Sequence, residues 1–283
     1  MQWVIPEVEA RSNGRLKIDY YPANQLGSSN EQIDGVIAGT IDVLPLGCNV
    51  MGNLGKYWII DSLPFIFRDR DHRIKYNNSE LNQQRHEDLI KEQSLKVIGY
   101  NWYRTPHVLE SVKPILKPGD FSGFKMRVPE SRGQYIGWKE LGTNPVTLPW
   151  GEVYLSLKQG DADGVSIPFE MIPEQKFYEV AKYVIMLKTE WSYENIMMNE
   201  KAYQKLPEEL RDILIDVLKE GGDKYTELSD QNYDVALKLL KEKGIEILFV
   251  DNSLFREKLK GLPEKLDKEG LLDKEMFEKV ENL

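Results

Sequence analysis

The chain has 283 residues, 41% of them hydrophobic and 29% charged, which is enough to build the cores of two domains of ordinary size. Its 46 acidic residues outnumber its 37 basic residues and give a formal net charge of -9. This balance disfavours nucleic acid and anionic membrane surfaces as partners. Cys48 is the only cysteine, so no intramolecular disulfide can form.

No apolar run comes near the ~20 residues of a transmembrane helix. The first residues, Met-Gln-Trp-Val-Ile-Pro-Glu-Val-Glu, lack the basic start and the long apolar stretch of a secretion signal. If this protein is exported, we therefore expect that the sequence represents it without its leader, since no signal peptide is present in this chain.

Hydrophobic periodicity and the positions of Gly and Pro predict an alternating α/β order. The expected elements are helix 3–11, strand 16–20, helix 31–38, strand 41–46, strand 96–100, strand 125–128, a helix ending at 141, strand 146–148, helix 152–159, a strand after 163, strands 183–187 and 194–199, a long helix 207–243 and strand 245–250. We expect Gly221-Gly222 to bend the long helix.

One pattern occurs twice: strand, proline, helix, Gly-x-x-Asp, strand. Its first copy contains Gly39 and Asp42, and its second contains Gly160 and Asp163. A chance match between such small units is one explanation. The other is a pair of similarly built α/β lobes that enclose a small ligand and close on a hinge.

Arg127 is the first candidate for a ligand-binding residue. It lies on the strand Lys125-Met126-Arg127-Val128, which Pro129 ends because proline cannot continue the sheet ladder. Ligands of open α/β sheets bind beyond the carboxyl ends of the strands, and a guanidinium there fits a carboxylate or phosphate with two hydrogen bonds. Arg104 also follows a strand. A surface ion pair is the alternative reading of a lone arginine.

Other chemistry has no support in the sequence. The three histidines have no metal-ligand spacing, and a single cysteine makes a zinc site improbable. Nucleotide-binding and nucleophile motifs are absent, and no two carboxylates form a recognisable acid/base pair. We therefore expect no metal and no cofactor.

Several motifs in order resemble the solute-binding proteins of tripartite ATP-independent periplasmic (TRAP) transporters, of the dicarboxylate-binding, DctP-like type. The matching pieces are Ser12 to Ile18, Gln25-Leu26-Gly27, Gly39 to Val43, Leu63 to Phe67, Gly123 to Pro129, Glu152-Val153-Tyr154, Asp163-Gly164, Gln175 to Val180 and Leu206 to Glu209. Each motif is weak alone, but nine in sequence with consistent spacing are a strong signal.

The resemblance implies an α/β, two-lobed periplasmic-binding-protein-like fold with a hinge and a long helix that spans both lobes. We expect residues 1–103 and 193–232 in lobe I, and residues 104–192 and 233–283 in lobe II. Such a protein is periplasmic or extracytoplasmic, captures an organic acid and delivers it to the TRAP membrane permease subunits. We expect a monomer that binds no nucleic acid and is not an enzyme.

The resemblance also implies which residues bind the ligand. Arg127 clamps the carboxylate, Arg104 is a second basic ligand, and Trp150 is an aromatic lid. Glu130 and Tyr57 match further pocket positions. Trp191 and Tyr193 line the cleft or pack at the hinge.

Two departures from the family pattern affect the pocket. The first strand of the family and its substrate-facing loop are expected before Trp3 and are absent from this sequence. Ile167 stands where some members bind substrate with an asparagine. Ile167 and the aromatic residues therefore predict a small monocarboxylate with an apolar or aromatic body, in preference to a sugar acid.

Two rival functions are an enzyme and a cytoplasmic sensor. An enzyme acting on a small carboxylate on a similar two-lobed scaffold would need a base close to Arg127, for which Glu130 is the best candidate. A ligand-sensing module would normally carry a DNA-binding or signalling domain, for which this chain has no room.

Overall fold

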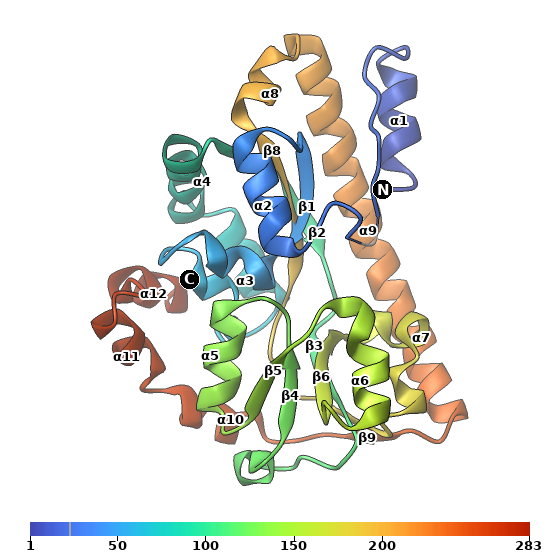
Figure 1. Ribbon diagram of the computed structural model, residues 1–283, viewed down its shortest axis with the longest axis vertical. Coiled ribbons are helices and arrows are strands. Elements are labelled where there is room, and N and C mark those ends of the chain that lie inside the picture. Colours follow the sequence, from blue (N-terminus) through green and yellow to red (C-terminus); the bar gives the residue numbers. More distant parts are fainter. Residues whose placement is uncertain (23) are drawn as a thin grey trace. The chain divides into compact units, whose positions relative to one another are not determined.

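The computed structural model describes residues 1–22 and 24–283, which divide into two compact units (Figure 1). Unit 1 consists of 1–47, 76–103 and 193–228, and unit 2 consists of 48–75, 104–192 and 229–283. Each unit has its own β-sheet with helices packed on it, as expected for an α/β fold.

Unit 1 is built on an antiparallel three-stranded sheet in the order β1-β8-β2. Its strands are β1 (Val43–Gly47), β2 (Leu95–Tyr103) and β8 (Tyr193–Asn199). The helices of this unit are α1 (Val4–Arg11), α2 (Ser29–Ala38), α4 (Glu80–Gln93), α8 (Glu200–Lys205), the first part of α9 (Glu208–Glu242) and the last residues of α3 (Arg70–Asn77).

The sequence explains the bounds of α2. Ser28 accepts a hydrogen bond from the Glu31 backbone N–H while the Glu31 side chain accepts one from the Ser28 N–H, which is a capping box. Gly39 ends the helix in the left-handed conformation, with φ 77°. Gly160 ends α6 in the same way, with φ 79°. The repeated Gly-x-x-Asp pattern therefore marks equivalent helix ends, one in each unit.

The predicted strand 16–20 is wrong, because this stretch joins neither sheet. Leu16 and Ile18 pack partly buried against the core of unit 1, while Tyr20 is 52% exposed. Alternation along a segment therefore does not make a strand unless a neighbouring strand is there to pair with it.

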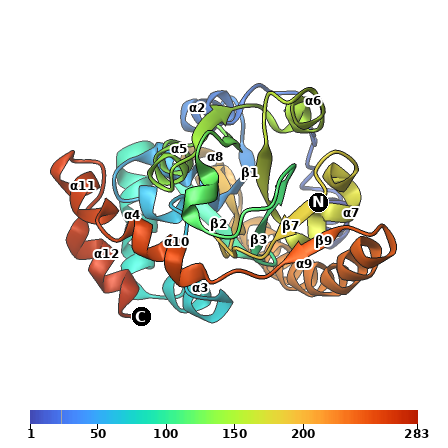
Figure 2. The same cartoon turned by 90° about the horizontal axis from the view of Figure 1, so that it is seen from below.

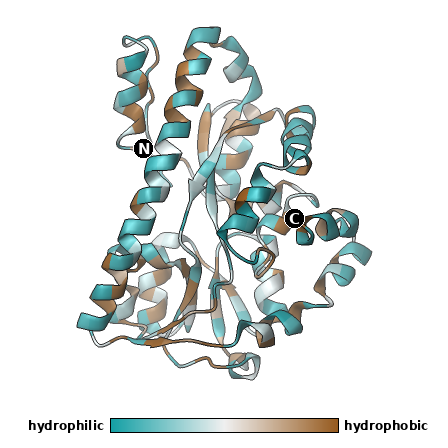
Figure 3. Ribbon diagram, turned by 180° about the vertical axis from the view of Figure 1, so that it is seen from behind, coloured by the Kyte–Doolittle hydropathy of each residue, from teal (hydrophilic) through white to brown (hydrophobic). Residues whose placement is uncertain are grey.

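The predicted bend at Gly221-Gly222 does not interrupt α9, which runs without a break. These glycines instead allow close packing. A Cβ on Gly221 would lie 2.8 Å from Val4 Cγ2, and one on Gly222 would lie 2.3 Å from Asn101 Oδ1. Hydrophobic residues recur along α9 with helical spacing, and α1 packs against its first part through Val4 and Val8 (Figure 3).

Unit 2 is built on a six-stranded mixed sheet in the order β5-β4-β6-β3-β7-β9. Its strands are β3 (His107–Ser111), β4 (Lys125–Val128), β5 (Asn144–Thr147), β6 (Gly164–Pro168), β7 (Tyr183–Ile185) and β9 (Glu246–Leu248). Strand β3 is antiparallel to both of its neighbours, β6 and β7, whereas β4 pairs parallel with β5 and β6, and β7 pairs parallel with β9.

Some of the helices of unit 2 pack on this sheet, and the second part of α9 packs beside β7 and β9 (Figure 2). The α-helices are α5 (Arg132–Glu140), α6 (Val153–Gln159), α7 (Ile172–Gln175), α10 (Asn252–Leu259), α11 (Leu262–Lys268), α12 (Lys274–Glu281) and most of α3. The 3-10 helices are η1 (Cys48–Leu54), η2 (Ile59–Asp61), η3 (Pro118–Phe121), η4 (Trp150–Glu152), η5 (Phe169–Met171) and η6 (Phe177–Glu179).

The sequence predicts that residues 48–75 and 229–232 belong to lobe I. In the structure, the contacts of these two segments group them with unit 2. The reason for 48–75 is hydrogen bonding to the loop after β4 and to α5. Asn53 Nδ2 donates to Glu130 O at 2.6 Å, and Gln134 Nε2 donates to Ser62 O at 2.6 Å. These bonds join residues more than 70 positions apart, which a reading of local pattern cannot supply.

None of the helices formed by residues 1–22 and 24–283 combines the length and the apolar character that crossing a membrane requires.

Candidate functional site

The candidate site lies at one edge of the sheet of unit 2. The parallel strands β4, β5, β6 and β7 all end at this edge, and the antiparallel strand β3 begins there. Ligands of α/β sheets bind beyond the carboxyl ends of such strands. We call this the carboxyl edge of unit 2.

Arg127 lies near the end of β4, as the sequence predicts, and is 6% exposed. Its Nε and Nη2 donate hydrogen bonds of 3.0 and 2.8 Å to the carbonyl oxygen of Leu148, the residue after β5. This carbonyl fixes the plane of the guanidinium from one side. Nη1 makes no hydrogen bond with any described residue and remains able to bind a ligand.

Arg127 has no acidic partner within residues 1–22 and 24–283, although it is buried. Desolvation by burial lowers the pKa of its guanidinium to about 10, so it is still a cation at neutral pH. A buried charge is costly unless it is paired. The geometry thus favours an anionic ligand as the missing partner, and not the surface ion pair that is the alternative reading of a lone arginine.

Trp150 begins η4, directly after β5, and its ring centroid is 5.2 Å from Arg127 Cζ. The ring is also packed edge-on against Phe177, with 5.6 Å between centroids. Cation–π contact holds the guanidinium beside the ring without using any of its N–H groups. The structure therefore brings Arg127 and Trp150 together.

Glu130 lies two residues beyond β4. Asn53 holds its backbone, and the side-chain Oε2 is buried without a hydrogen-bond partner in the described part of the chain. A buried carboxylate oxygen normally has a partner. Glu130 is thus placed to accept a hydrogen bond from a ligand.

Arg104 lies just before β3 and contacts the turn that follows β6. Its Nη1 is 2.6 Å from Met171 Sδ, and its backbone oxygen accepts a hydrogen bond from Arg70. Glu170, in the same turn, has one carboxylate oxygen bonded to Thr105 Oγ1, while Oε1 is buried and has no partner among the described residues. Burial raises the pKa of Glu170.

Ile167 is 0% exposed and belongs to the hydrophobic core beneath β6, with Val165 and Phe169. In this structure its side chain offers no surface to a solute. The prediction of an apolar ligand assumes that Ile167 forms part of the pocket wall, and the burial of this side chain contradicts that assumption.

The remaining aromatic candidates differ in their surroundings. Tyr57 lies between η1 and η2 and is 40% exposed, with Lys56 Nζ 4.8 Å from its ring centroid. Trp191 follows β7; its indole Nε1 is buried and has no partner in the described chain. Tyr193 is fully buried and belongs to unit 1, where its ring packs against Tyr103. Of these three residues, Trp191 is therefore the best candidate for a contact with a ligand.

A buried polar cluster at the carboxyl edge was missed by the sequence analysis. His107 Nε2 is 2.8 Å from Ser192 Oγ, and His107 Nδ1 is 3.2 Å from Ser166 Oγ and 3.7 Å from Glu190 Oε1. Burial raises the pKa of Glu190 to about 7. The only signal in the sequence was a glutamate and a serine directly after an apolar strand, which is too common a pattern to identify a site.

Ser192, His107 and Glu190 are neighbours in the same way as the serine, histidine and carboxylate of a hydrolase triad. Their surroundings do not suit the chemistry of such a triad. Ser192 is 4% exposed, and its hydroxyl lies against His107. Burial, together with the nearby Arg104, lowers the pKa of His107 to about 3, which makes it a weak general base. The cluster holds the 189–192 segment against β3.

Among the described residues, no cluster of His, Cys, Asp and Glu side chains is suited to hold a metal ion.

Comparison with known proteins identifies the family of the chain. The model of the bacterial extracellular solute-binding protein family 7 matches residues 6–268. The 2,3-diketo-L-gulonate-binding periplasmic protein YiaO of Escherichia coli is 29% identical over 78% of this chain and 67% of its own length. The sialic acid-binding periplasmic protein SiaP of Vibrio cholerae is 26% identical over 92% of this chain and 81% of its own.

A solved structure supports the same assignment. A TRAP periplasmic solute binding protein from Sulfitobacter sp. NAS-14.1, with bound β-D-galacturonate, is 26% identical and has a TM-score of 0.89. The match covers 99% of this chain and 92% of that one. The expected periplasmic-binding-protein-like fold is therefore confirmed.

Proposed function

The chain belongs to the bacterial extracellular solute-binding protein family 7, and we propose that it binds an organic acid through Arg127. Proteins of this family bind small organic acids and work with a TRAP permease. The observation that supports Arg127 is a buried guanidinium with Nη1 unbonded and with no acidic partner in the described chain. A ligand carboxylate would complete its hydrogen bonding with a charge-assisted pair.

We propose that the ligand is a hydroxylated organic acid. Ile167 offers no apolar wall, because it is buried in the core. Among the described residues, the carboxyl edge instead carries buried polar atoms without a hydrogen-bond partner, including Glu130 Oε2, Glu170 Oε1 and Trp191 Nε1. Hydroxyl groups can satisfy both carboxylate acceptors and an indole donor. The bound galacturonate of the Sulfitobacter protein and the diketo-gulonate named for YiaO are acids of this class.

We further propose that the protein acts as a monomer outside the cytoplasmic membrane, with a TRAP permease as its partner, and that it catalyses no reaction. The periplasmic relatives support the location. The low pKa of His107 counts against the enzyme alternative.

A thermal-shift screen of organic acids tests the proposal. Pairs of acids that differ only in hydroxyl groups, such as galacturonate against tetrahydropyran-2-carboxylate, are added to the parent protein and to Arg127→Met. A ligand at 100 times its dissociation constant stabilises a protein by roughly 2.7 kcal/mol. We expect hydroxylated acids to raise the Tm of the parent and to have little effect on Arg127→Met. Equal shifts in both proteins would contradict the assignment of Arg127, and shifts by apolar acids alone would contradict the ligand class.

A further inference from the structure

Asn195 is a fully buried polar residue whose hydrogen bonds are not satisfied by the protein. It lies in the middle of β8 and is 0% exposed. Neither Oδ1 nor Nδ2 has a hydrogen-bond partner among residues 1–22 and 24–283. Asn77, at the end of α3, is 1% exposed, and its Oδ1 also has no partner there. Roughly nine in ten buried polar groups in proteins have a partner, so two such amides in one unit need an explanation.

The pairing of β2 with β8 shows where Asn195 lies. Ile196 pairs with Gly99 and Glu194 pairs with Trp102, so two residues of β2, Tyr100 and Asn101, stand opposite the single residue Asn195. This is a β-bulge, which locally disrupts the ladder and redirects side chains. Bulges occur preferentially beside functional sites, and a glycine inside a strand often marks one.

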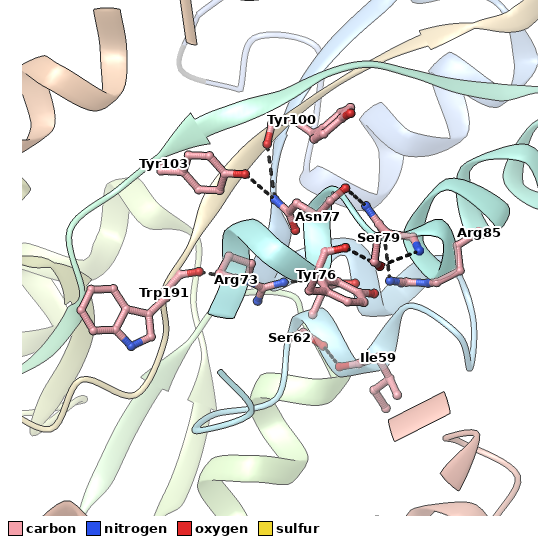
Figure 4. A network of polar contacts seen from close by, with 12 residues as sticks. Ile59, Ser62, Arg73, Tyr76, Asn77, Ser79, Arg85, Tyr100, Tyr103 and Trp191 are labelled. Atoms are coloured by element: carbon pink, nitrogen blue, oxygen red, sulfur yellow. Dashed lines mark hydrogen bonds and ion pairs between the residues drawn. The ribbon is translucent and has the colours of Figure 1, made fainter. Parts of the chain in front are cut away.

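Asn77 reaches the same bulge from α3. Its Nδ2 lies 3.4 Å from the carbonyl oxygen of Tyr100 and 3.4 Å from the hydroxyl of Tyr103 (Figure 4). Cα atoms directly opposite each other in an antiparallel pair are only about 4.5–5.5 Å apart. Since Tyr100 stands opposite Asn195, both amides lie beside the bulge.

Tyr193 and Asn195 lie on the same face of β8, because they are two residues apart. Tyr193 pairs with Tyr103, and the centroids of the two rings are 6.1 Å apart. The face of the sheet around the bulge therefore carries two amides and two phenols, all in unit 1. We call these four residues, Asn77, Tyr103, Tyr193 and Asn195, the bulge cluster.

We propose that the bulge cluster is a binding site for a hydroxyl group, supplied either by a buried water molecule or by a small neutral solute. Asn195 offers one acceptor and two donors, and Asn77 adds a second acceptor. A hydroxyl both donates and accepts, so it can bond to the two amides at once. The cluster contains no charged side chain, which makes it a poor match for an ion. The cluster belongs to unit 1, whereas Arg127 belongs to unit 2.

Replacing Asn195 by leucine, which has nearly the same volume, distinguishes an occupied site from an empty one. If a hydroxyl is bound, Asn195→Leu removes the hydrogen bonds between Asn195 and that hydroxyl. The hydroxyl and Asn77 Oδ1 are then left unsatisfied, and Tm falls by about 2–4 °C. If nothing is bound, the leucine removes two unsatisfied buried atoms and raises Tm, which would overturn the proposal. Asn199→Leu is the matched control, because Asn199 is also buried on β8 but bonds to Val36 O and Ala202 N.

Two further measurements separate the sources of the hydroxyl and do not depend on the variant folding. A high-resolution crystal structure of the solute-free protein shows a water molecule within ~3.2 Å of Asn195 and Asn77 if water is the occupant. Ethylene glycol raises the Tm of the parent more than that of Asn195→Leu if a solute hydroxyl binds. The absence of both a bound water and an ethylene glycol effect would overturn the proposal.

Discussion

Arg127 and Leu148 are joined by two hydrogen bonds, from Nε and Nη2 of the arginine to one carbonyl oxygen, at 3.0 and 2.8 Å. This carbonyl lies one residue beyond β5, the parallel neighbour of β4. The sheet therefore sets the orientation of the guanidinium before a ligand arrives. Such preorganisation reduces the free energy that ordering the side chain would otherwise cost.

Arg127→Lys should weaken ligand binding almost as much as Arg127→Met. A lysine keeps the positive charge, but its single ammonium cannot bond to Leu148 O and hold a carboxylate in the planar geometry of the guanidinium. Loss of one partner of a desolvated charge pair costs about 2–5 kcal/mol, a fall in affinity of about 30-fold or more. Calorimetry with the best acid from the screen measures this. Arg132→Met, which removes an exposed arginine just beyond the site, should bind like the parent.

Asp61→Ala should destabilise unit 2 strongly, because it leaves a buried charge without its partner. Asp61 Oδ1 and Arg73 Nη1 are 2.6 Å apart, and the two side chains are 0% and 3% exposed. Breaking such a pair costs about 3–5 kcal/mol of the free energy of unfolding. Arg73 also donates to the backbone oxygen of Trp191, so the change should reach the carboxyl edge (Figure 4).

Urea denaturation measures this cost, and Asp230→Ala is the matched control. Asp230 pairs with Arg70 at 2.7 Å, but its side chain is 51% exposed. An exposed pair contributes about 1 kcal/mol or less. If both substitutions cost the same, burial does not decide the strength of the Asp61–Arg73 pair.

The sequence predicted those features that depend on local pattern. Gly39 and Gly160 were identified as helix ends from their position after an apolar helix, and both adopt the left-handed conformation that favours glycine. Arg127 was placed at a strand end because Pro129 cannot extend a ladder. The family resemblance implied that Trp150 is an aromatic lid, but its contact with the Arg127 guanidinium came only from the structure.

Features that depend on contacts between distant segments could not be predicted. The family resemblance implied that Ile167 is a pocket residue, but which face of β6 is buried depends on α6 and α9. His107 had no local signal at all, since its partners Ser166 and Ser192 are 59 and 85 residues away. The segment 16–20 had the alternation of a strand and no neighbour to pair with.

Gly221→Ala should lower stability although alanine is the better helix former. In an exposed helix this change gains about 1 kcal/mol. Here the added Cβ would lie 2.8 Å from Val4 Cγ2 and 3.0 Å from two ring carbons of Trp102. Overpacking of a core costs about 1–3 kcal/mol, which exceeds the gain. Thermal unfolding measures the result, with the exposed Lys219→Ala as a neutral control. A higher Tm for Gly221→Ala would mean that α1 moves away from α9 at no cost.

Glu110 should make the protein less stable as pH rises. It is 0% exposed in the middle of β3, neither carboxylate oxygen has a hydrogen-bond partner in the described chain, and burial raises its pKa well above 4.5. Above pH 4.5 the unfolded chain loses this proton while the folded chain keeps it, so the free energy of unfolding falls with pH until the folded pKa is reached.

Glu110→Gln removes this titration and should therefore be more stable than the parent at pH 8, with a smaller difference at pH 4.5. Urea denaturation at the two pH values measures the effect. Glu246→Gln, at an exposed position in the same sheet, corrects for the general effect of removing a carboxylate. If the difference between Glu110→Gln and the parent is the same at both pH values, Glu110 has a partner that stabilises its charge, and the carboxylate is ionised inside the fold.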